Sequence, residues 1–438
     1  MTQVAEKLQP WVAAIDQRPQ GGPRWLQDLR DRAAARFTAL GFPTVRDEEW
    51  RFTNVAPIVA AEFRVSEDET ARVTEAELSA YLYSDADHRV VVVNGRFAPE
   101  LSHLEGLPAG VRVGSLAAAV TDQPEVVQRY FGQLADFGTR AFTALNTALA
   151  ADGAYVSIAD GIILEQPLHL VFVSTNADAP VLTNARALIV AGDRTQARIV
   201  ETFAGPRGAV YFTNAVSEIV AGENAVIDHY KVQEESFDAF HVASMHVHLA
   251  RSATFSSHSF SLGGKVVRND ALAILDGEGG DCTLNGLYLA DRDRLIDNHT
   301  TIDHAKPHCG SHEVYKGILG GTSRAVFNGK IIVRQDAQKT DAKQTNRALL
   351  LTDGATINTK PQLEIFADDV KCTHGAAIGQ LDEDAMFYMR ARGIDVDSAR
   401  NMLIHAFAGQ VLDGIQSDAV RDVAVRLMEE KLNLTHQI

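Results

Sequence analysis

A short sequence that recurs in the middle of the chain limits the folds that are possible. The pattern Ile-Val-Ala-Gly-acidic occupies residues 189–193 and again residues 219–223. Both copies lie in short runs rich in Val, Ile and Thr that are broken by Gly, Asp and Asn. Repeats with a period of roughly 20 to 50 residues indicate stacked units, each of which buries its apolar face only against its neighbours.

The composition of the repeats favours one kind of stack. Each unit consists of short strands and contains no helix, and a weaker copy follows at 248–260. A leucine-rich horseshoe should be dominated by leucine, and a propeller blade of four strands needs a repeat of about 40 residues. The strict hexapeptide period of left-handed β-helices is absent. We therefore predict a mainly β protein with a right-handed parallel β-helix over residues 151–380.

The first part of the chain, residues 1–150, has mainly helical patterns. Apolar residues recur at every fourth position through 24–40, and Gly41 then provides a residue that can end the helix in a left-handed conformation. The segment from 124 to about 150 predicts another helix. An Asn-Gly turn inside the apolar segment 89–101 predicts one hairpin in this region.

Helical periodicity returns in residues 381–438. Asp382 and Gly393 are suited to begin and end a first helix. Two further helices are expected, with apolar stripes that either pack on each other or bind a partner protein. The residues that we expect to contact a partner are Met402, Leu403, Phe407, Val423 and Leu427.

Charge and composition exclude several classes of protein. The formal net charge of −16 argues against binding to nucleic acid, which requires a basic surface. No apolar run approaches about 18 residues, so we expect no membrane span. The three cysteines, Cys282, Cys309 and Cys372, are odd in number and far apart, which is typical of a reducing compartment. Because the first residues show no signal-peptide pattern, we expect a cytoplasmic protein.

Motifs for the common enzyme chemistries are missing. The sequence contains no G-x-x-x-x-G-K-[ST] phosphate loop, no G-x-S-x-G nucleophile turn and no H-E-x-x-H zinc helix. One segment is rich in possible zinc ligands, but Pro307 prevents a regular helical face there and structural roles are favoured. Its residues are His299, His304, His308, Cys309 and His312. We expect a protein that is not an enzyme.

Cys372 and His374 form the sharpest candidate site. Apolar residues alternate through 370–378, which predicts a strand with both side chains on one face and their α-carbons about 7 Å apart. A thiolate and an imidazole in this arrangement are able to share one metal ion or one edge of a cluster. Val370 and Ile378 share that face, so an ordinary interior position remains the alternative. Two ligands do not complete a site, and the others would come from elsewhere, such as a second chain.

Three stretches of the sequence resemble a known family. They are RDEEWRFTNVAPI at 46–58, the run at 306–351 and the run at 359–394 that contains Cys372 and His374. Together they are similar to the SufB/SufD family, the scaffold subunits of the SUF system that assembles iron–sulfur clusters. SufB chains carry an acidic residue after the histidine and an additional cysteine, so Cys-Thr-His-Gly-Ala resembles the SufD branch.

The resemblance implies a fold, partners and a site. It implies helical domains on both sides of a right-handed β-helix, a partner SufB paired through that β-helix, and two copies of the ATPase SufC docked on C-terminal helices. By its position in the motif, His374 matches the proposed cluster-assembly histidine, and Cys372 is its neighbour.

The resemblance also bears on cofactors. It implies that no cofactor is held stably by the isolated chain, that an iron–sulfur cluster forms transiently in the complex, and that iron acquisition and reduced flavin belong to the complex. No flavin motif is present in the sequence. An exposed strand edge makes a homodimer of the isolated chain an additional possibility.

A β-helix enzyme that cleaves carbohydrate is the main rival. Such an enzyme requires a groove with clustered acids, often with Arg or Lys and calcium, and it is usually secreted. The expected cytoplasmic location and the C-terminal helices disfavour this alternative.

Overall fold

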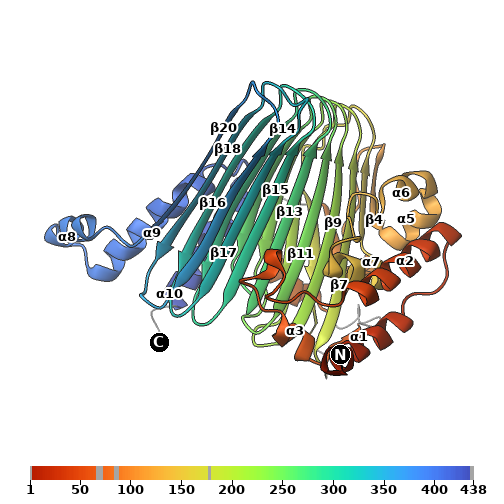
Figure 1. The fold of residues 1–438 in the computed structure, drawn as a ribbon, viewed down its shortest axis with the longest axis horizontal. Coiled ribbons are helices and arrows are strands. Elements are labelled where there is room, and N and C mark those ends of the chain that lie inside the picture. Colours follow the sequence, from red (N-terminus) through yellow and green to blue (C-terminus); the bar gives the residue numbers. More distant parts are fainter. Residues whose placement is uncertain (1, 66–72, 83–87, 176–178, 435–438) are drawn as a thin grey trace.

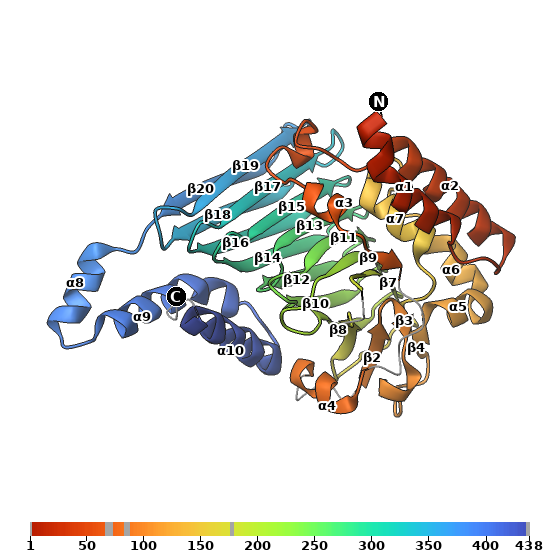
Figure 2. The same cartoon turned by 90° about the horizontal axis from the view of Figure 1, so that it is seen from below.

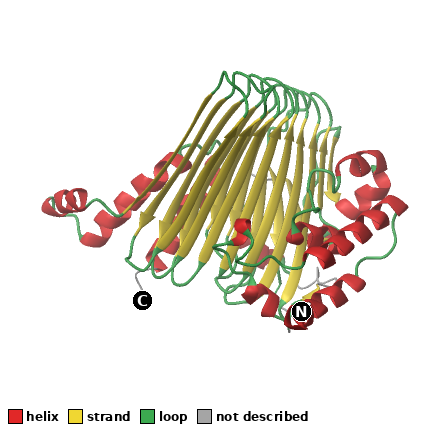
Figure 3. Ribbon diagram, in the orientation of Figure 1, coloured by secondary structure: helices red, strands yellow, loops and turns green. Residues whose placement is uncertain are grey.

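The fold is a solenoid of β-strands with helices packed on both of its outer faces (Figures 1 and 3). It is known from a computed structural model that describes residues 2–65, 73–82, 88–175 and 179–434. Two sheets, each of 10 strands, run along the solenoid. The first sheet contains β1 (Arg64–Val65), β4 (Val111–Ser115), β5 (Ala154–Ile158), β7 (Val181–Ala191), β9 (Tyr211–Ala221), β11 (Phe240–Leu249), β13 (Val266–Leu275), β15 (Leu295–His304), β17 (Arg324–Val333) and β19 (Thr356–Ile365). The second contains β2 (His88–Val93), β3 (Arg96–Phe97), β6 (Leu168–Val173), β8 (Gln196–Ala204), β10 (Val226–Gln233), β12 (Thr254–Ser261), β14 (Asp281–Ala290), β16 (Gly310–Leu319), β18 (Asp341–Leu350) and β20 (Lys371–Gly379).

The sequence repeat corresponds to one turn of the solenoid. Strands β7 and β9 pair in parallel, with Ile189 opposite Ile219 and Ala191 opposite Ala221. All four side chains point inward and belong to the main apolar core. The glycine of the second repeat, Gly222, stacks so closely on the turn below that a Cβ atom there would overlap its backbone. The prediction of a parallel β-helix is therefore confirmed. The sequence repeat arises because equivalent strands and corners of successive turns stack on each other.

The hairpin predicted near residue 94 is also confirmed, and it starts the solenoid. Strands β2 and β3 pair antiparallel around Asn94 and Gly95, which have φ angles of 49° and 85°. β2 pairs in parallel with β6, and β4 pairs with β5. Both sheets thus extend into the segment 88–115, inside the part of the chain that we predicted to be mainly helical.

N-terminal helices cover the outer face of the first sheet (Figure 2). The predicted helix at 24–40 is confirmed, and the Gly41 N–H donates a 2.8 Å hydrogen bond to the Phe37 carbonyl oxygen where that helix ends. Phe37 and Phe142 pack there in one aromatic cluster with Phe212 of the sheet. The helical elements of this region are α1 (Thr2–Asp16), α2 (Arg24–Leu40), η1 (Glu48–Trp50), α3 (Ala56–Ala60), α4 (Glu75–Leu78), η3 (Ser79–Tyr81), η4 (Pro99–Leu101), α5 (Leu116–Asp122), α6 (Pro124–Tyr130) and α7 (Ala141–Leu149).

One predicted helix is wrong in its extent. The segment 124–150 forms two helices, α6 and α7, instead of one. Between them the chain turns at Gly132, where φ is 70°, and three backbone N–H groups point at the buried carboxylate of Glu218. These bonds to a side chain of β9 replace helical bonds, so a distant residue breaks the helix.

The C-terminal helices cover the second sheet. They are α8 (Glu383–Ala391), α9 (Val396–Leu412) and α10 (Asp418–Leu434). Asp382 caps α8 as predicted, and Gly393 follows its end with φ of 86°. Helices α9 and α10 bury apolar residues against outward residues of the second sheet, whereas α8 projects away from the solenoid (Figures 1 and 2). Within the described residues no helix is long and apolar enough to cross a membrane.

Candidate functional site at the open end of the solenoid

The last turn of the solenoid has no further turn stacked on it. β19 and β20 are the final strands of their sheets, and each pairs on one side only. Large apolar side chains are therefore left in contact with solvent at this end. Ile365, Phe366 and Ile378 are 40%, 64% and 49% exposed. An uncovered strand edge that carries apolar residues is typical of a surface that pairs with another chain.

His374 lies at this open end. It is opposite Gln344 in the register of β18 and β20, and Cys372 is opposite Ala342. Gln344 and Ala342 point into the solenoid and are buried, so the inward direction that the strand pattern indicated is confirmed. Burial of the site is not confirmed, because His374 is exposed and Cys372 is half-buried. The reason is that no further strand covers β20 on its open side.

Cys372 is the less accessible of the two residues. Its side chain packs at the edge of a small apolar cluster that includes Ile331, Ala342 and Ala367. Burial raises the pKa of the Cys372 thiol, so it is mainly protonated at neutral pH. Binding a metal through this sulfur requires loss of that proton. An exposed imidazole beside a protonated thiol makes His374 the more available ligand.

A polar pair lies directly behind His374. Gln344 Nε2 donates a hydrogen bond of 2.8 Å to Glu313 Oε2, and both residues are about 1% exposed. Burial raises the pKa of Glu313 to about 7. An acid of this kind exchanges its proton near neutral pH, although it lies inside the solenoid.

Replacing Glu313 with Gln should change how stability depends on pH. The unfolded chain ionises this acid above about pH 4.5, whereas the folded chain holds the proton up to about pH 7. Stability contributed by the protonated acid is therefore lost as the pH rises between these values. We therefore expect the free energy of unfolding of Glu313→Gln, relative to that of the wild type, to increase by about 2 kcal/mol from pH 5 to pH 8. Urea unfolding at several pH values measures this difference, and parallel pH profiles for the two proteins would contradict it.

The histidine-rich segment does not form a zinc site. His304 points into the solenoid, where its Nε2 lies 2.9 Å from Ser311 Oγ. His308 is exposed at a corner, and His299 lies on the outer face of the first sheet against Asp297. Among the described residues, no group of three or more His, Cys, Asp or Glu side chains is arranged to hold a metal ion. The structural roles that the sequence favoured are consistent with these positions.

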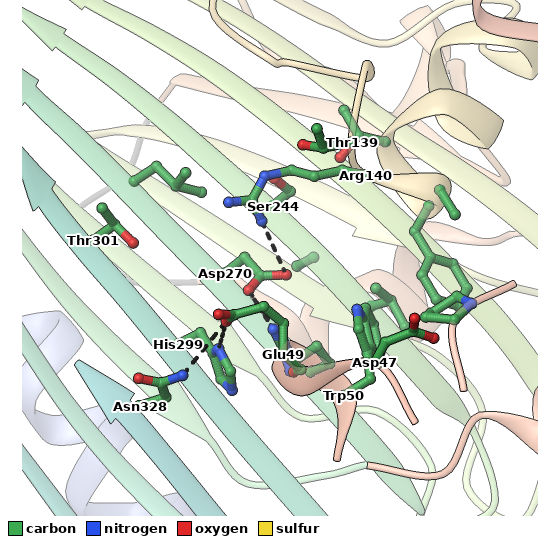
Figure 4. A pocket seen from close by; sticks show the side chains of 18 of the residues that line it. Asp47, Glu49, Trp50, Thr139, Arg140, Ser244, Asp270, His299, Thr301 and Asn328 are labelled. Atoms are coloured by element: carbon green, nitrogen blue, oxygen red, sulfur yellow. Dashed lines mark hydrogen bonds and ion pairs between the residues drawn. The ribbon is translucent and has the colours of Figure 1, made fainter. Parts of the chain in front are cut away.

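A pocket of about 500 Å³ lies between the N-terminal segment and the first sheet (Figure 4). The segment 46–58 forms part of its wall, and Trp50 anchors that segment with its ring 4.5 Å from the Arg268 guanidinium. Glu49 Oε2 lies 3.2 Å from His299 Nδ1, and Arg140 Nη1 lies 3.9 Å from Asp270 Oδ2. The segment is thus a turn at the surface that an aromatic side chain anchors. Each of these two pairs joins opposite charges, so neither pair selects a ligand of one sign.

His299 ties this segment to the solenoid. Burial lowers its pKa, but the ion pair with Asp297 more than offsets that effect, and the pKa of His299 is raised overall. The protonated imidazole bridges Asp297 on β15 and Glu49 on the N-terminal segment. Because the folded pKa is raised, this stabilisation is present below about pH 6.5 and is lost as the pH rises above it.

The residues predicted to contact a partner in the C-terminal helices have unequal exposure. Met402 is 53% exposed, and Leu403 is half-buried. Phe407 and Val423 pack at the edge of the core between the helices and the second sheet. Leu427 is 2% exposed inside that core, so its prediction as a contact residue is wrong for this chain. The apolar stripe that contains Leu427 is covered by the second sheet of the same chain. Helical periodicity shows that a stripe is apolar, but it does not show whether the chain itself or a partner covers that stripe.

Comparison with known proteins identifies the family. The model for the SUF system FeS cluster assembly, SufBD core domain, matches residues 172–407, and the model for the SufBD protein N-terminal region matches residues 15–170. The chain belongs to the SufBD family. Its SufBD core contains β20 and therefore the open end with His374.

Individual relatives agree with this assignment over almost the full length. A SufBD family protein of iron–sulfur cluster assembly from Synechocystis is 36% identical over 89% of this chain and 87% of its own length. The iron–sulfur cluster assembly protein SufD of Escherichia coli is 31% identical over 90% of both chains. SufD of Bacillus subtilis is 25% identical over 94% of both. As the resemblance implied, this SufBD family chain takes part in iron–sulfur cluster assembly.

Two features of the site were not predicted from the sequence. Glu313 and Gln344 each lie one turn of the solenoid before their register partners, Gln344 and His374, so they are not part of a local motif. The only signal is their place in alternating strands, where a polar residue at an inward position is unusual. The pocket beside Trp50 was also missed, because it joins residues from distant parts of the chain.

Proposed function

We propose that this chain is a non-catalytic scaffold subunit for iron–sulfur cluster assembly in the cytoplasm. Membership of the SufBD family supports the process, and the position of His374 supports a specific role in it. The observation that carries the proposal is an inward-directed imidazole left exposed at an uncovered end of the solenoid. Such a site is incomplete alone and becomes enclosed when a second chain binds there.

The second chain is SufB, a β-solenoid of the same family. Apolar residues at the open end and the unpaired edge of β20 supply the two features that strand-to-strand pairing requires. A second copy of this chain has the same edge, which makes a homodimer the expected state when SufB is absent. Residues from the two solenoids would then surround His374.

His374 acts as a nitrogen ligand to a nascent cluster, with Cys372 as an accessory residue. A neutral imidazole is a suitable ligand for iron, because a protonated ring has no lone pair to donate to the metal. Because one chain offers only one or two ligands, the cluster is transient and shared with the partner. Iron acquisition, and reduced flavin if it takes part, belong to the complex.

The C-terminal helices dock the ATPase SufC. α8 projects from the solenoid, and apolar side chains are exposed along α8 and the start of α9. They are Phe387, Tyr388, Val396 and Met402, which are 74%, 57%, 47% and 53% exposed. ATP hydrolysis by SufC would move these helices, and α9 in turn contacts β14 and β16 of the solenoid.

Two substitutions separate docking from folding in these helices. Met402→Glu should abolish capture of SufC and leave the free energy of unfolding within about 0.5 kcal/mol of the wild type. Leu427→Ala should instead lower the free energy of unfolding by about 2–5 kcal/mol, because it opens a cavity in the core. Capture of SufC by Met402→Glu at the wild-type level would contradict the docking surface.

The experiment that tests the proposal uses the full chain with an affinity tag. It is co-expressed with SufB and SufC, purified, and supplied with iron and sulfide. We expect all three chains to purify together and to show the visible absorbance of an iron–sulfur cluster. A chain that purifies alone, or a complete complex that never holds a cluster, would overturn the proposal.

A further inference from the structure

A column of inward side chains ends at His374. In the second sheet, Leu284, Glu313, Gln344 and His374 occupy the same register position on four successive strands. Neighbouring strands lie about 4.8 Å apart, so side chains in one column stack on each other. Gln344 is thus the residue directly behind His374 on the inner side.

The amide of Gln344 is held in one orientation. Its Nε2 donates to Glu313 Oε2 at 2.8 Å. A side chain at position 329 would overlap Nε2, and Gly329 leaves the space that the amide occupies. Above about pH 7 the Glu313 carboxylate is ionised and only accepts, so the NH₂ group faces Glu313 and Oε1 faces away from it.

Gln344 Oε1 lacks a donor. It is buried, and no hydrogen-bond partner for it exists among the described residues. A buried acceptor without a partner costs about 1–3 kcal/mol, so such atoms normally find a donor. The neighbour on the open side of Gln344 is its register partner His374, whose exposed ring makes no hydrogen bond to Oε1 in this structure and would have to turn inward to reach it.

We propose that Gln344, held by Glu313, positions His374 by accepting a hydrogen bond from one ring N–H of the imidazole. A neutral imidazole has one N–H and one lone pair. Fixing the N–H toward Gln344 therefore turns the lone pair of the other nitrogen away from it, toward the uncovered end. Metal-binding histidines are commonly oriented by an acceptor of this kind. The inference rests on the proposed ligand role of His374 only for its functional consequence, since the hydrogen bond itself needs no cluster.

The tautomer of His374 tests the hydrogen bond directly. The full chain is labelled with ¹⁵N-histidine, and the ring nitrogens are observed by long-range ¹H–¹⁵N correlation at pH 8, where the Glu313 carboxylate is ionised. Loss of one signal in His374→Ala assigns the resonance. We expect a single tautomer in the wild type and a mixture, as in a free imidazole, in Gln344→Met.

Two further variants make the test specific. Glu313→Gln preserves shape but lets the Gln344 amide turn either way, so it should also give a mixture. Gln362→Met changes the same residue type on the last strand of the other sheet, and it should leave the single tautomer intact. A His374 tautomer that is the same in the wild type, Gln344→Met and Glu313→Gln would overturn the inference, as would a mixture already present in the wild type.

Cluster loading of the complex gives the second readout. Gln344→Met should reduce the iron–sulfur cluster bound to the purified complex by about tenfold, which is the usual effect of removing an orienting acceptor. If Gln344→Met changes the tautomer of His374 but the complex is still fully loaded with cluster, the hydrogen bond is supported and the ligand role of His374 is disproved. An unchanged tautomer would disprove the positioning role, whatever the cluster does.

Discussion

Replacing Glu218 with Ala should lower the free energy of unfolding by about 3–5 kcal/mol. Glu218 is fully buried and forms an ion pair with Arg186, which is also fully buried. Its carboxylate accepts hydrogen bonds from the backbone N–H groups of Gly132, Leu134 and Ala135 at 2.9–3.1 Å. The substitution leaves a buried guanidinium without its counter-charge and three N–H groups without their acceptor.

The matched control lies in the turn that follows the same strand. Glu223 also forms an ion pair, with Arg251 at 2.7 Å, but the two side chains are 45% and 58% exposed. Glu223→Ala should change stability by no more than about 1 kcal/mol. Chemical unfolding followed by circular dichroism compares the two variants. If both variants lose the same free energy of unfolding, the buried Glu218–Arg186 pair does not stabilise the packing of the N-terminal helices on the solenoid.

Replacing Ile378 with Asp should abolish the proposed pairing of the chain with SufB. Ile378 is 49% exposed on β20, the last strand of its sheet at the open end. Enclosing an unpaired carboxylate in an interface costs several kcal/mol, so affinity should fall by about 100-fold or more. The folded state should be unaffected, because the side chain is in contact with solvent in the free chain.

An equivalent substitution at the other end of the solenoid provides the control. Ile163 is 60% exposed between β5 and β6, and Ile163→Asp adds the same charge far from the open end. Co-purification and analytical ultracentrifugation of both variants measure pairing. If Ile378→Asp retains SufB as well as Ile163→Asp does, the partner does not bind at β20.

The sequence predicted the solenoid because its physical cause is local and repetitive. Ile189 and Ile219 stack one turn apart, and the glycine in each copy permits the close contact of corners. The helix at 24–40 was predicted for a similar reason, since its apolar stripe and its terminal glycine are adjacent in the sequence. Features that depend on one segment and its copies are therefore accessible from sequence alone.

Other features depend on residues that meet only in the folded chain. The break between α6 and α7 is caused by Glu218 of β9, which is far from it in the sequence, so no local pattern reports it. Leu427 has the spacing of a contact residue, but only the position of the second sheet shows that it is buried. The inward direction of His374 followed from alternation, whereas its exposure depends on where the solenoid stops.

The most direct test of the central claim is the amount of iron–sulfur cluster on a complex that contains His374→Ala. The variant chain is co-purified with SufB and SufC, and iron, sulfide and visible absorbance are measured per complex. His308→Ala, which removes an exposed histidine at a distant corner, is the control. We predict that His374→Ala forms an intact complex with about tenfold less cluster, while His308→Ala is fully loaded. An intact His374→Ala complex with a full complement of cluster would contradict the account.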